Sequence, residues 1–191
     1  MNNIILKPAT MADSKLLMDW RNDPETIKAS HNSKAVTIKK HFEWLKNTIK
    51  NPDKQLFIAW KISGIIGNKY GDIGDVLQPV GTIRSDYHLE ENCYELSWTV
   101  APKARGQGIG KQMVSTLAKR MADKNIRAEI KPENVASIKI AEAAGMKFDK
   151  VEYRYISDTE KEPVSLIYLY KRYRKRTCVA LLSGFKYNLY F

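Results

Sequence analysis

Residues 94–110 read YELSWTVAPKARGQGIG, and this stretch decides the fold. Its first part, Tyr94–Val100, has the aromatic and β-branched residues that are typical of a strand. Three glycines follow at alternate positions, Gly106, Gly108 and Gly110. Beyond them, apolar residues recur with the spacing of one helix face. These residues are Ile109, Met113, Val114, Leu117 and Met121. The order is therefore a strand, a glycine-rich loop and an amphipathic helix.

A loop of this kind is suited to bind phosphate. Glycine lets successive backbone N–H groups turn toward one point without obstruction by a Cβ atom, and the helix N-terminus behind the loop adds partial positive charge. We predict that the loop holds the pyrophosphate of a coenzyme, with Arg105 as a charged contact at its rim. A nucleoside-triphosphate loop is excluded because no Gly-Lys-Ser/Thr occurs, and the glycine spacing does not fit the dinucleotide pattern Gly-x-Gly-x-x-Gly.

The composition limits the class of protein. The chain has 191 residues, of which 43% are hydrophobic and 28% charged, as is usual for a globular domain. No apolar run approaches the roughly 20 residues of a membrane span, and the first residues do not resemble a secretory signal. Two isolated cysteines, Cys93 and Cys178, have neither metal-site spacing nor a disulfide framework. They predict a cytoplasmic protein without a metal site.

The net charge of +11 is unevenly distributed. Residues 171–191 contain six basic and no acidic residues, which leaves 26 basic against 21 acidic residues in the rest of the chain. This mild excess argues against a nucleic-acid partner and favours an anionic coenzyme and an anionic substrate. We predict an enzyme domain over residues 1–170 and an extension over 171–191 that is first basic and then apolar. This extension has three alternative roles: an added strand or packed segment, a homodimer contact, or an anchor to an acidic surface.

Strands and helices alternate along the domain. Turn residues and hydrophobic spacing predict strands at 4–7, 55–62, 80–85, 94–100, 127–131, 147–156 and 164–170. Four helices are predicted. The first starts at Thr10, where Asp13 completes a capping box, and ends at residues 22–24; the others start at Thr37 and after Gly108 and span residues 136–144. The helix from Thr37 is expected to bury a stripe of Ile38, Phe42, Leu45 and Ile49. The segment 64–75, interrupted by four glycines, is interpreted as a long, mobile hairpin loop that hangs over a substrate site.

The order βααβββαβαββ indicates a single α/β domain with a mixed sheet. At this point the chain resembles the GNAT family of N-acetyltransferases, over residues 1 to about 170. The family's coenzyme loop follows the pattern Arg/Gln-x-x-Gly-x-Gly/Ala, which Arg105, Gly108 and Gly110 match. A second family segment has an Asn after a strand, a Ser or Ala three residues later and a Gly eleven after the Asn. The matching residues are Asn134, Ser137 and Gly145.

The resemblance implies a mixed, mostly antiparallel sheet of six to seven strands, with helices on both faces and a splay between the fourth and fifth strands. It also implies that acetyl-CoA is the co-substrate and that no metal is needed. The pantetheine arm would pair with the backbone of Thr99, Val100 and Ala101, Asn134 would bond the arm, and Ser137 would lie near the sulfur. Backbone amides of the loop and the following turn would hold the pyrophosphate. They belong to Arg105, Gly106, Gln107, Gly108, Ile109, Gly110 and Lys111.

Acetyl transfer to an amine requires that the amine lose a proton and that the departing thiolate gain one. Glu95, on the fourth strand where family members keep a Glu, is the predicted base, and its alternative role is a strand-face carboxylate beside a basic neighbour. Many relatives carry a Tyr as acid seven residues after the Asn, but this position is Ala141 here. Ser137, a water molecule, Tyr153 or Tyr155 are the candidates that replace it.

The N-terminal region resembles a branch of the family that acetylates amino sugars attached to nucleotides, in pathways such as that of pseudaminic acid. The substrate contacts that this implies are Trp20, Arg21, Asn22 and His41. Arg21, Lys39 and Lys40 are the candidates to meet the phosphates of such a substrate. Three alternatives remain: a ribosomal-protein or other protein N-terminal acetyltransferase, an aminoglycoside acetyltransferase, and an inactive coenzyme-A-binding module.

Overall fold

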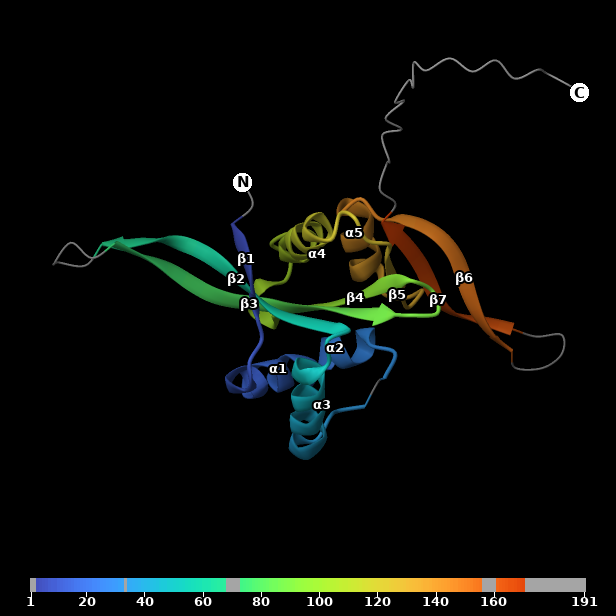
Figure 1. Cartoon of the computed structure of the whole chain (residues 1–191), viewed down its shortest axis with the longest axis horizontal. Helices are drawn as coiled ribbons and strands as arrows, with labels where there is room; N and C mark the ends of the chain where they lie inside the picture. The colour runs from blue at the N-terminus through green and yellow to red at the C-terminus, as the bar shows by residue number, and fades with distance from the viewer. Residues whose placement is uncertain (1–2, 33, 68–72, 156–160, 171–191) are drawn as a thin grey trace, which may run out of the picture.

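The computed structural model describes residues 3–32, 34–67, 73–155 and 161–170. They form one seven-stranded sheet in the order β1-β2-β3-β4-β5-β7-β6 (Figure 1). Its strands are β1 (Ile4–Pro8), β2 (Lys54–Gly67), β3 (Ile73–His88), β4 (Cys93–Val100), β5 (Ile126–Ile130), β6 (Lys147–Tyr155) and β7 (Lys161–Tyr170). All neighbouring strands are antiparallel except β4 and β5, which are parallel. The predicted mixed sheet is confirmed, and the predicted extension 171–191 lies outside the described residues.

Helices cover both faces of the sheet, as predicted (Figure 1). One face carries α1 (Ser14–Arg21), which follows the short 3-10 turn η1 (Met11–Asp13), and also α2 (Pro24–Ala29) and α3 (Ile38–Lys50). The other face carries α4 (Ile109–Arg120), which follows the turn η2 (Pro102–Ala104), and α5 (Val135–Ala143). The capping box predicted at Thr10 and Asp13 is present. The sheet therefore separates the N-terminal helices from the helix that follows the glycine-rich loop.

Helix α2 is an addition to the predicted order, which treats residues 22–24 as a helix end alone. The Asp23 carboxylate accepts a hydrogen bond of 3.1 Å from the backbone N–H of Thr26, and Pro24 occupies the first helical position. Both features are typical of a helix start. The same short segment therefore ends α1 and starts α2.

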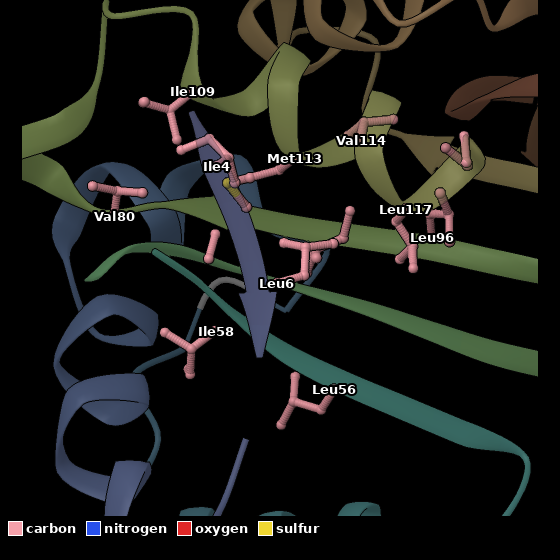
Figure 2. Close-up of a cluster of buried hydrophobic side chains, with 14 of the residues drawn as sticks. Ile4, Leu6, Leu56, Ile58, Val80, Leu96, Ile109, Met113, Val114 and Leu117 are labelled. Atoms are coloured by element: carbon pink, nitrogen blue, oxygen red, sulfur yellow. The ribbon is translucent and has the colours of Figure 1, made fainter. Parts of the chain in front are cut away.

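The main core lies between the sheet and α4 (Figure 2). The predicted inner face of α4 is buried: Ile109, Met113, Val114 and Leu117 are at most 2% exposed. The buried cluster also includes the strand side chains Ile4, Leu6, Leu56, Ile58, Val80 and Leu96, of which Leu56 and Ile58 lie on the opposite face of the sheet, toward the N-terminal helices. Full burial of a side chain of this size contributes roughly 1.5–3 kcal/mol. This packing fixes the N-terminus of α4 close to the end of β4.

Helix α3 begins after Thr37 as predicted, but it buries a different face. Of the predicted stripe, Ile38, Phe42 and Ile49 are 74%, 50% and 41% exposed, and only Leu45 is buried. The buried face consists of His41, Leu45 and Thr48. The predicted stripe is wrong because apolar spacing identifies the most hydrophobic face of a helix, whereas the face of α3 that meets the rest of the domain carries polar side chains.

Strands β2 and β3 are longer than predicted. Ile65 pairs with Asp75, and Gly67 pairs with Ile73, so the predicted hairpin is confirmed, and the described part of its arms consists of paired strands instead of a loop. The hairpin projects from the sheet away from α2 and α3 (Figure 1). Its tip, residues 68–72, lies outside the described residues. The predicted position over the substrate site is therefore wrong for the part of the hairpin that the structure describes.

The predicted splay between the fourth and fifth strands is confirmed. Tyr94 pairs with Ile126 and Glu95 with Arg127, and within the described residues no pair joins β4 to β5 beyond these two. On its other edge, β4 stays paired with β3 as far as Val100. From Leu96 onward, the edge of β4 that faces β5 therefore has backbone groups that the sheet does not use.

Gly81 sets how closely β3 and β4 approach each other. A Cβ atom at this position would lie 2.6 Å from the backbone oxygen of Thr99 and 3.0 Å from Sδ of Met113. Because the backbone oxygen moves only if β4 moves, we expect Gly81→Ala to lower the free energy of unfolding by about 1–3 kcal/mol. Urea unfolding measures this change. Gln55→Ala, at an exposed position of β2, is the control and should stay within about 0.5 kcal/mol of the wild type; equal losses in both variants would contradict the close approach.

Candidate active site

A cavity of about 590 Å³ lies beside the open part of the β4–β5 gap. Its walls come from α1, α3 and the loop after α2 on one side and from β4, β5 and the start of α5 on the other. The predicted residues Glu95, Thr99, Asn134 and Ser137 all line it. The structure therefore brings the N-terminal helices and the second family segment to one place.

The glycine-rich loop has the backbone conformation that its sequence predicts. Gly106 and Gly108 have φ angles of +75° and +71°, in the left-handed region that favours glycine. Gly108 is the N-cap of α4 and provides no side chain to satisfy the first amides of that helix. Those amides have no acceptors within the helix. The loop and the first turn of α4 therefore present unsatisfied N–H groups beside the end of β4.

Gly110 is a glycine for a different reason from the one predicted. It lies inside α4, where a Cβ atom would come within 2.4 Å of Cδ1 and 2.9 Å of Cγ1 of Ile140 on α5. The missing side chain therefore allows α4 and α5 to pack closely. The backbone amide of Gly110 still belongs to the first turn of the helix, where an anion would bind.

Arg105 connects the loop to the N-terminal helices. One of its guanidinium nitrogens, Nη2, donates to the Asp23 carboxylate and, at 3.1 Å, to the hydroxyl of Thr26. Burial alone would raise the pKa of Asp23, but the hydrogen bonds from Arg105 and Thr26, with the charge of Arg105, outweigh it and hold the pKa below its ordinary value. The predicted contact of Arg105 with pyrophosphate stays a prediction, because the side chain in this structure is turned to Asp23.

Asn134 and Ser137 shape the start of α5. Oδ1 of Asn134 accepts a hydrogen bond of 3.1 Å from the backbone N–H of Ser137, and its Nδ2 donates to the carbonyl of Ala29 at 3.3 Å. Asn134 is thus the N-cap of α5 and also joins it to α2. One amide hydrogen of Asn134 and the hydroxyl of Ser137 remain as the groups that a ligand in the cavity would meet.

Three of the four predicted substrate residues line the cavity: Trp20, Arg21 and His41. The fourth, Asn22, is not among the lining residues. Its side chain donates to the carbonyl of Val36 at 2.9 Å and accepts from the N–H of Val36 at 2.8 Å, so it holds the loop between α2 and α3. Asn22 therefore supports the wall of the cavity from behind.

His41 is a neutral, buried side chain. It is 3% exposed, and its ring contacts Trp44 with a centroid separation of 5.4 Å. Burial lowers the pKa of His41, and a hydrogen bond with the backbone of Ser14 offsets this in part. An imidazole below its ordinary pKa is uncharged near pH 7. His41 therefore adds shape to the cavity without adding positive charge.

Glu95 lines the cavity but is already bound to a cation. Nε and Nη2 of Arg127 donate to its Oε2 at 3.0 and 2.7 Å. Nε2 of His88 lies 3.7 Å from the same oxygen. Glu95 faces the cavity, as a base must, and it also lies beside a basic neighbour, as its alternative role requires. Its assignment as the base stays a prediction.

The structure also adds residues that the sequence interpretation omits. These are Glu129 on β5, Lys131 directly after it, His31 after α2, Arg84 on β3 and the rings of Trp44 and Trp98. Lys40, a predicted phosphate contact, lines the cavity, whereas Lys39 does not. The sequence contains a signal for Glu129. Apolar residues alternate in β5, where Ile126, Ala128 and Ile130 are buried, so residues 127 and 129 lie together on the other face.

The predicted replacements for the missing acid differ in position. Ala141 is fully buried in α5, so this position offers no proton donor. Tyr153 is 44% exposed on β6, at the edge of the sheet, and does not line the cavity. The side chain of Tyr155 lies outside the described part of the structure. Ser137 is the predicted residue that does line the cavity.

The profile of the acetyltransferase (GNAT) domain family matches residues 3–147. The chain belongs to the GNAT acetyltransferase family. It is an acyltransferase that uses acetyl-CoA as its donor and an amine as its acceptor. No curated protein sequence matches the chain.

Solved structures share the fold at low sequence identity. Spermidine N-acetyltransferase from Vibrio cholerae, in complex with CoA and spermine, has a TM-score of 0.69 and 10% identity, over 90% of this chain and 97% of that one. A GNAT-family acetyltransferase from Bacillus anthracis has a TM-score of 0.66 and 18% identity, over 88% and 94%. AAC(6')-Ib, in complex with ribostamycin and coenzyme A, has a TM-score of 0.66 and 16% identity, over 93% and 99%. At these identities the likeness concerns the fold.

The residues present fit acetyl-CoA. The loop with two left-handed glycines and the free amides of α4 suit a pyrophosphate. The unpaired edge of β4 after Glu95 suits the amide groups of a pantetheine arm. Among the described residues no group of three or more His, Cys, Asp or Glu side chains is placed to hold a metal ion. None of the described helices is long and apolar enough to cross a membrane.

The Asp23–Arg105 contact has a pH dependence that can be measured. Because the folded pKa of Asp23 is lowered, the contact stabilises the protein above the ordinary carboxyl pKa of about 4 and is lost as the pH falls through the folded pKa. We expect Asp23→Asn to lower the free energy of unfolding by about 1 kcal/mol at pH 7, and the difference from the wild type to shrink below pH 4. Denaturant unfolding at pH 7, 5, 4 and 3 tests this. A difference that is independent of pH would contradict it.

Proposed function

We propose that the acceptor is a primary amine on an anionic molecule, and specifically a nucleotide-linked amino sugar. The observation that carries this proposal is the charge of the cavity wall. Four basic side chains line it, Arg21, Lys40, Arg84 and Lys131, against the two carboxylates of Glu95 and Glu129. Glu95 is in addition neutralised by Arg127. When the paired groups are set aside, Arg21 and Lys40 face the single carboxylate of Glu129, so the wall keeps a positive balance, which favours an anionic acceptor.

Arg21 and Lys40 are the basic groups suited to contact such a substrate. Arg84 is paired with Asp86 at 2.9 Å, and Lys131 lies 3.4 Å from Glu133. By contrast, within the described residues neither Arg21 nor Lys40 has a carboxylate partner.

The guanidinium of Arg21 is held in place before any ligand binds. Its Nη2 donates to the carbonyl of Asn32 at 2.7 Å, while its Nη1 is buried without a protein acceptor in the part of the chain that is described. Burial lowers the pKa of Arg21, but an arginine stays charged at neutral pH. A partly buried charge of this kind is stabilised by an anion, and phosphate oxygens match the planar guanidinium.

Aromatic side chains add a second reason. Trp20, Trp44 and Trp98 all line the cavity. Sugar rings and nucleobases both present flat or apolar faces that pack well on an indole. A polycation such as spermine, which is the ligand in the V. cholerae structure, has neither the charge nor the shape that this wall favours.

The residues of this chain bind and orient the substrates. Acetyl-CoA supplies an activated acyl carbon. The amides of Arg105 to Lys111 hold its pyrophosphate, and the backbone of Thr99 to Ala101 aligns the arm. Asn134 and Ser137 lie beside the arm, where the Ser137 hydroxyl provides a proton to the departing sulfur. Arg21 and Lys40, on the opposite wall, hold the anionic part of the acceptor so that its amine faces β4 and β5.

A panel of acceptors tests the proposal. The purified protein and acetyl-CoA are mixed with UDP-glucosamine, glucosamine, spermidine and a peptide with a free N-terminus, and thiol release is followed. We expect the highest kcat/KM for the nucleotide-linked sugar, because it carries both the amine and the anion. Preferred turnover of spermidine would contradict the anionic acceptor. Preferred turnover of the peptide would instead support the protein N-terminal acetyltransferase.

Arg21→Gln and Lys40→Gln test the contact itself. Each variant should raise KM for UDP-glucosamine by about tenfold with little change in kcat, because the contact acts on binding rather than on the reacting bond. Lys39→Gln is the matched control, since Lys39 is exposed on the same helix but does not line the cavity. An equal rise in KM for Lys39→Gln would contradict a specific contact, because it would show that the overall positive charge of the surface attracts the substrate.

A further inference from the structure

Two glutamates face the cavity from neighbouring strands, and their surroundings differ. Glu95 is on β4 and Glu129 is on β5, on the two sides of the point where these strands separate. Glu95 pairs in register with Arg127, and Glu129 lies two residues beyond Arg127 on the same face of β5. Both carboxylates therefore stand near the closed end of the gap, away from the glycine-rich loop at its other end.

The carboxylate of Glu95 belongs to an ion-pair cluster. Arg127 donates to Glu95 through two nitrogens and to Glu91 through a third. Burial lowers the pKa of Arg127, but the hydrogen bond and charge of Glu95 and the charge of Glu91 more than offset it, so the pKa is raised. Because Arg127 stays charged, the lone pairs of Glu95 that it occupies are poorly available to a third group.

The carboxylate of Glu129 has no such partner. Its Oε1 accepts a hydrogen bond of 2.5 Å from the hydroxyl of Ser165, which is 1% exposed on β7. Nε2 of His31 lies 3.8 Å from the same oxygen. Among the described residues no lysine or arginine forms an ion pair with Glu129. The side chain is thus oriented by a neutral donor and remains able to accept a proton.

His31 connects Glu129 to solvent. Its side chain is 47% exposed, whereas that of Glu129 is 29% exposed. An imidazole exchanges protons rapidly near neutral pH. The arrangement is therefore a buried orienting hydroxyl, a carboxylate facing the cavity and a histidine that reaches water.

We propose that Glu129, rather than Glu95, is the general base for the acceptor amine, with His31 carrying the proton onward to solvent. An N–H bond of the ammonium breaks, its electron pair stays on nitrogen, and the proton goes to the carboxylate of Glu129. The neutral amine then forms the N–C bond to the acetyl carbon as the C–S bond breaks, and the electron pair of that bond leaves with sulfur. The nitrogen, now positively charged, loses its second proton to give the amide; the Ser137 hydroxyl protonates the thiolate and is itself reprotonated by that second proton. The proton passes from Glu129 to Nε2 of His31. This proposal rests on acetylation of an amine in this cavity, whatever molecule bears the amine.

The other charged groups around Glu129 have partners of their own. On β5, Arg127 is bound to Glu95 and Glu91, and directly after β5 the Nζ of Lys131 lies 3.4 Å from Oε1 of Glu133. From β3, Nε2 of His88 lies 3.7 Å from Glu95. The described structure gives Glu129 one titratable neighbour within ion-pair distance, which is His31.

The test uses two small amines that enter the cavity regardless of the natural acceptor. Ethanolamine is an ammonium ion at neutral pH and needs a base, whereas hydroxylamine is already neutral and does not. We expect Glu129→Gln to lower kcat/KM for ethanolamine by about 100-fold or more, and for hydroxylamine by no more than about threefold. The acid limb of the pH profile for ethanolamine should move to higher pH in this variant, because the rate then follows the neutral fraction of ethanolamine itself. Glu95→Gln should retain both the limb and the difference between the two amines.

Controls separate this role from folding and from coenzyme binding. Glu152→Gln on the edge strand β6, where Glu152 is paired with Lys150, should leave both rates unchanged. Calorimetry should show the same Kd for acetyl-CoA in Glu129→Gln and the wild type, and thermal unfolding should show the same Tm. His31→Ala should slow ethanolamine acetylation severalfold and recover when imidazole is added to the buffer, which a merely structural role would not explain.

Three results would overturn the proposal. One is an equal loss for both amines in Glu129→Gln. Another is a shift of the acid limb to higher pH in Glu95→Gln with the limb of the wild type kept in Glu129→Gln. The third is a wild-type enzyme that does not accelerate ethanolamine acetylation at any pH, because a base that faces an open cavity acts on any amine that enters. Failure of UDP-glucosamine as an acceptor would contradict the proposed substrate and leave this assignment to be decided by the two small amines.

Discussion

The structure depends on one interruption in its sheet. The parallel strands β4 and β5 are joined at Tyr94 and Glu95, by backbone pairing and by the contact of Glu95 with Arg127, and then separate. Backbone N–H and C=O groups that are withdrawn from a sheet need other partners, because leaving them unsatisfied in a buried place is costly. The gap is therefore a site for a ligand with amide groups of its own. The ion pair at its closed end also keeps the two strands together where the cavity begins.

The glycine-rich loop and the N-terminal helices are positioned by this same gap. The loop follows directly from β4, and α4 is fixed behind it by the buried side chains of Ile109 and Met113. On the opposite face, Asp23 at the start of α2 holds Arg105 of the loop, and Asn134 joins α5 to Ala29 at the end of α2. The donor side and the acceptor side of the site are thus connected through α2. This short helix contributes more to the site than its six residues suggest.

The sequence predicts the parts of the fold that depend on local patterns. The seven strands along the chain, the helix α4 and the loop with Gly106 and Gly108 follow from hydrophobic spacing and glycine positions, and the structure confirms them. Contacts between distant residues escape such patterns. The partner of Arg105 lies 82 positions away, and Glu129 meets Ser165 across 36 positions. The stripe on α3 is misassigned for a related reason, since His41 is buried by its place in the domain and not by its hydrophobicity.

Hydrogen exchange of backbone amides, with and without acetyl-CoA, tests most directly the central claim that the β4–β5 gap and the loop form one coenzyme site. Without the coenzyme, the amides of α4 beyond its first turn should be protected, because they are bonded within the helix. With it, exchange should slow together at residues 96–101 of the β4 edge and at residues 106–111 of the loop, and should stay unchanged at the β6–β7 edge. Binding without protection of these two segments, or protection centred elsewhere, would contradict the account.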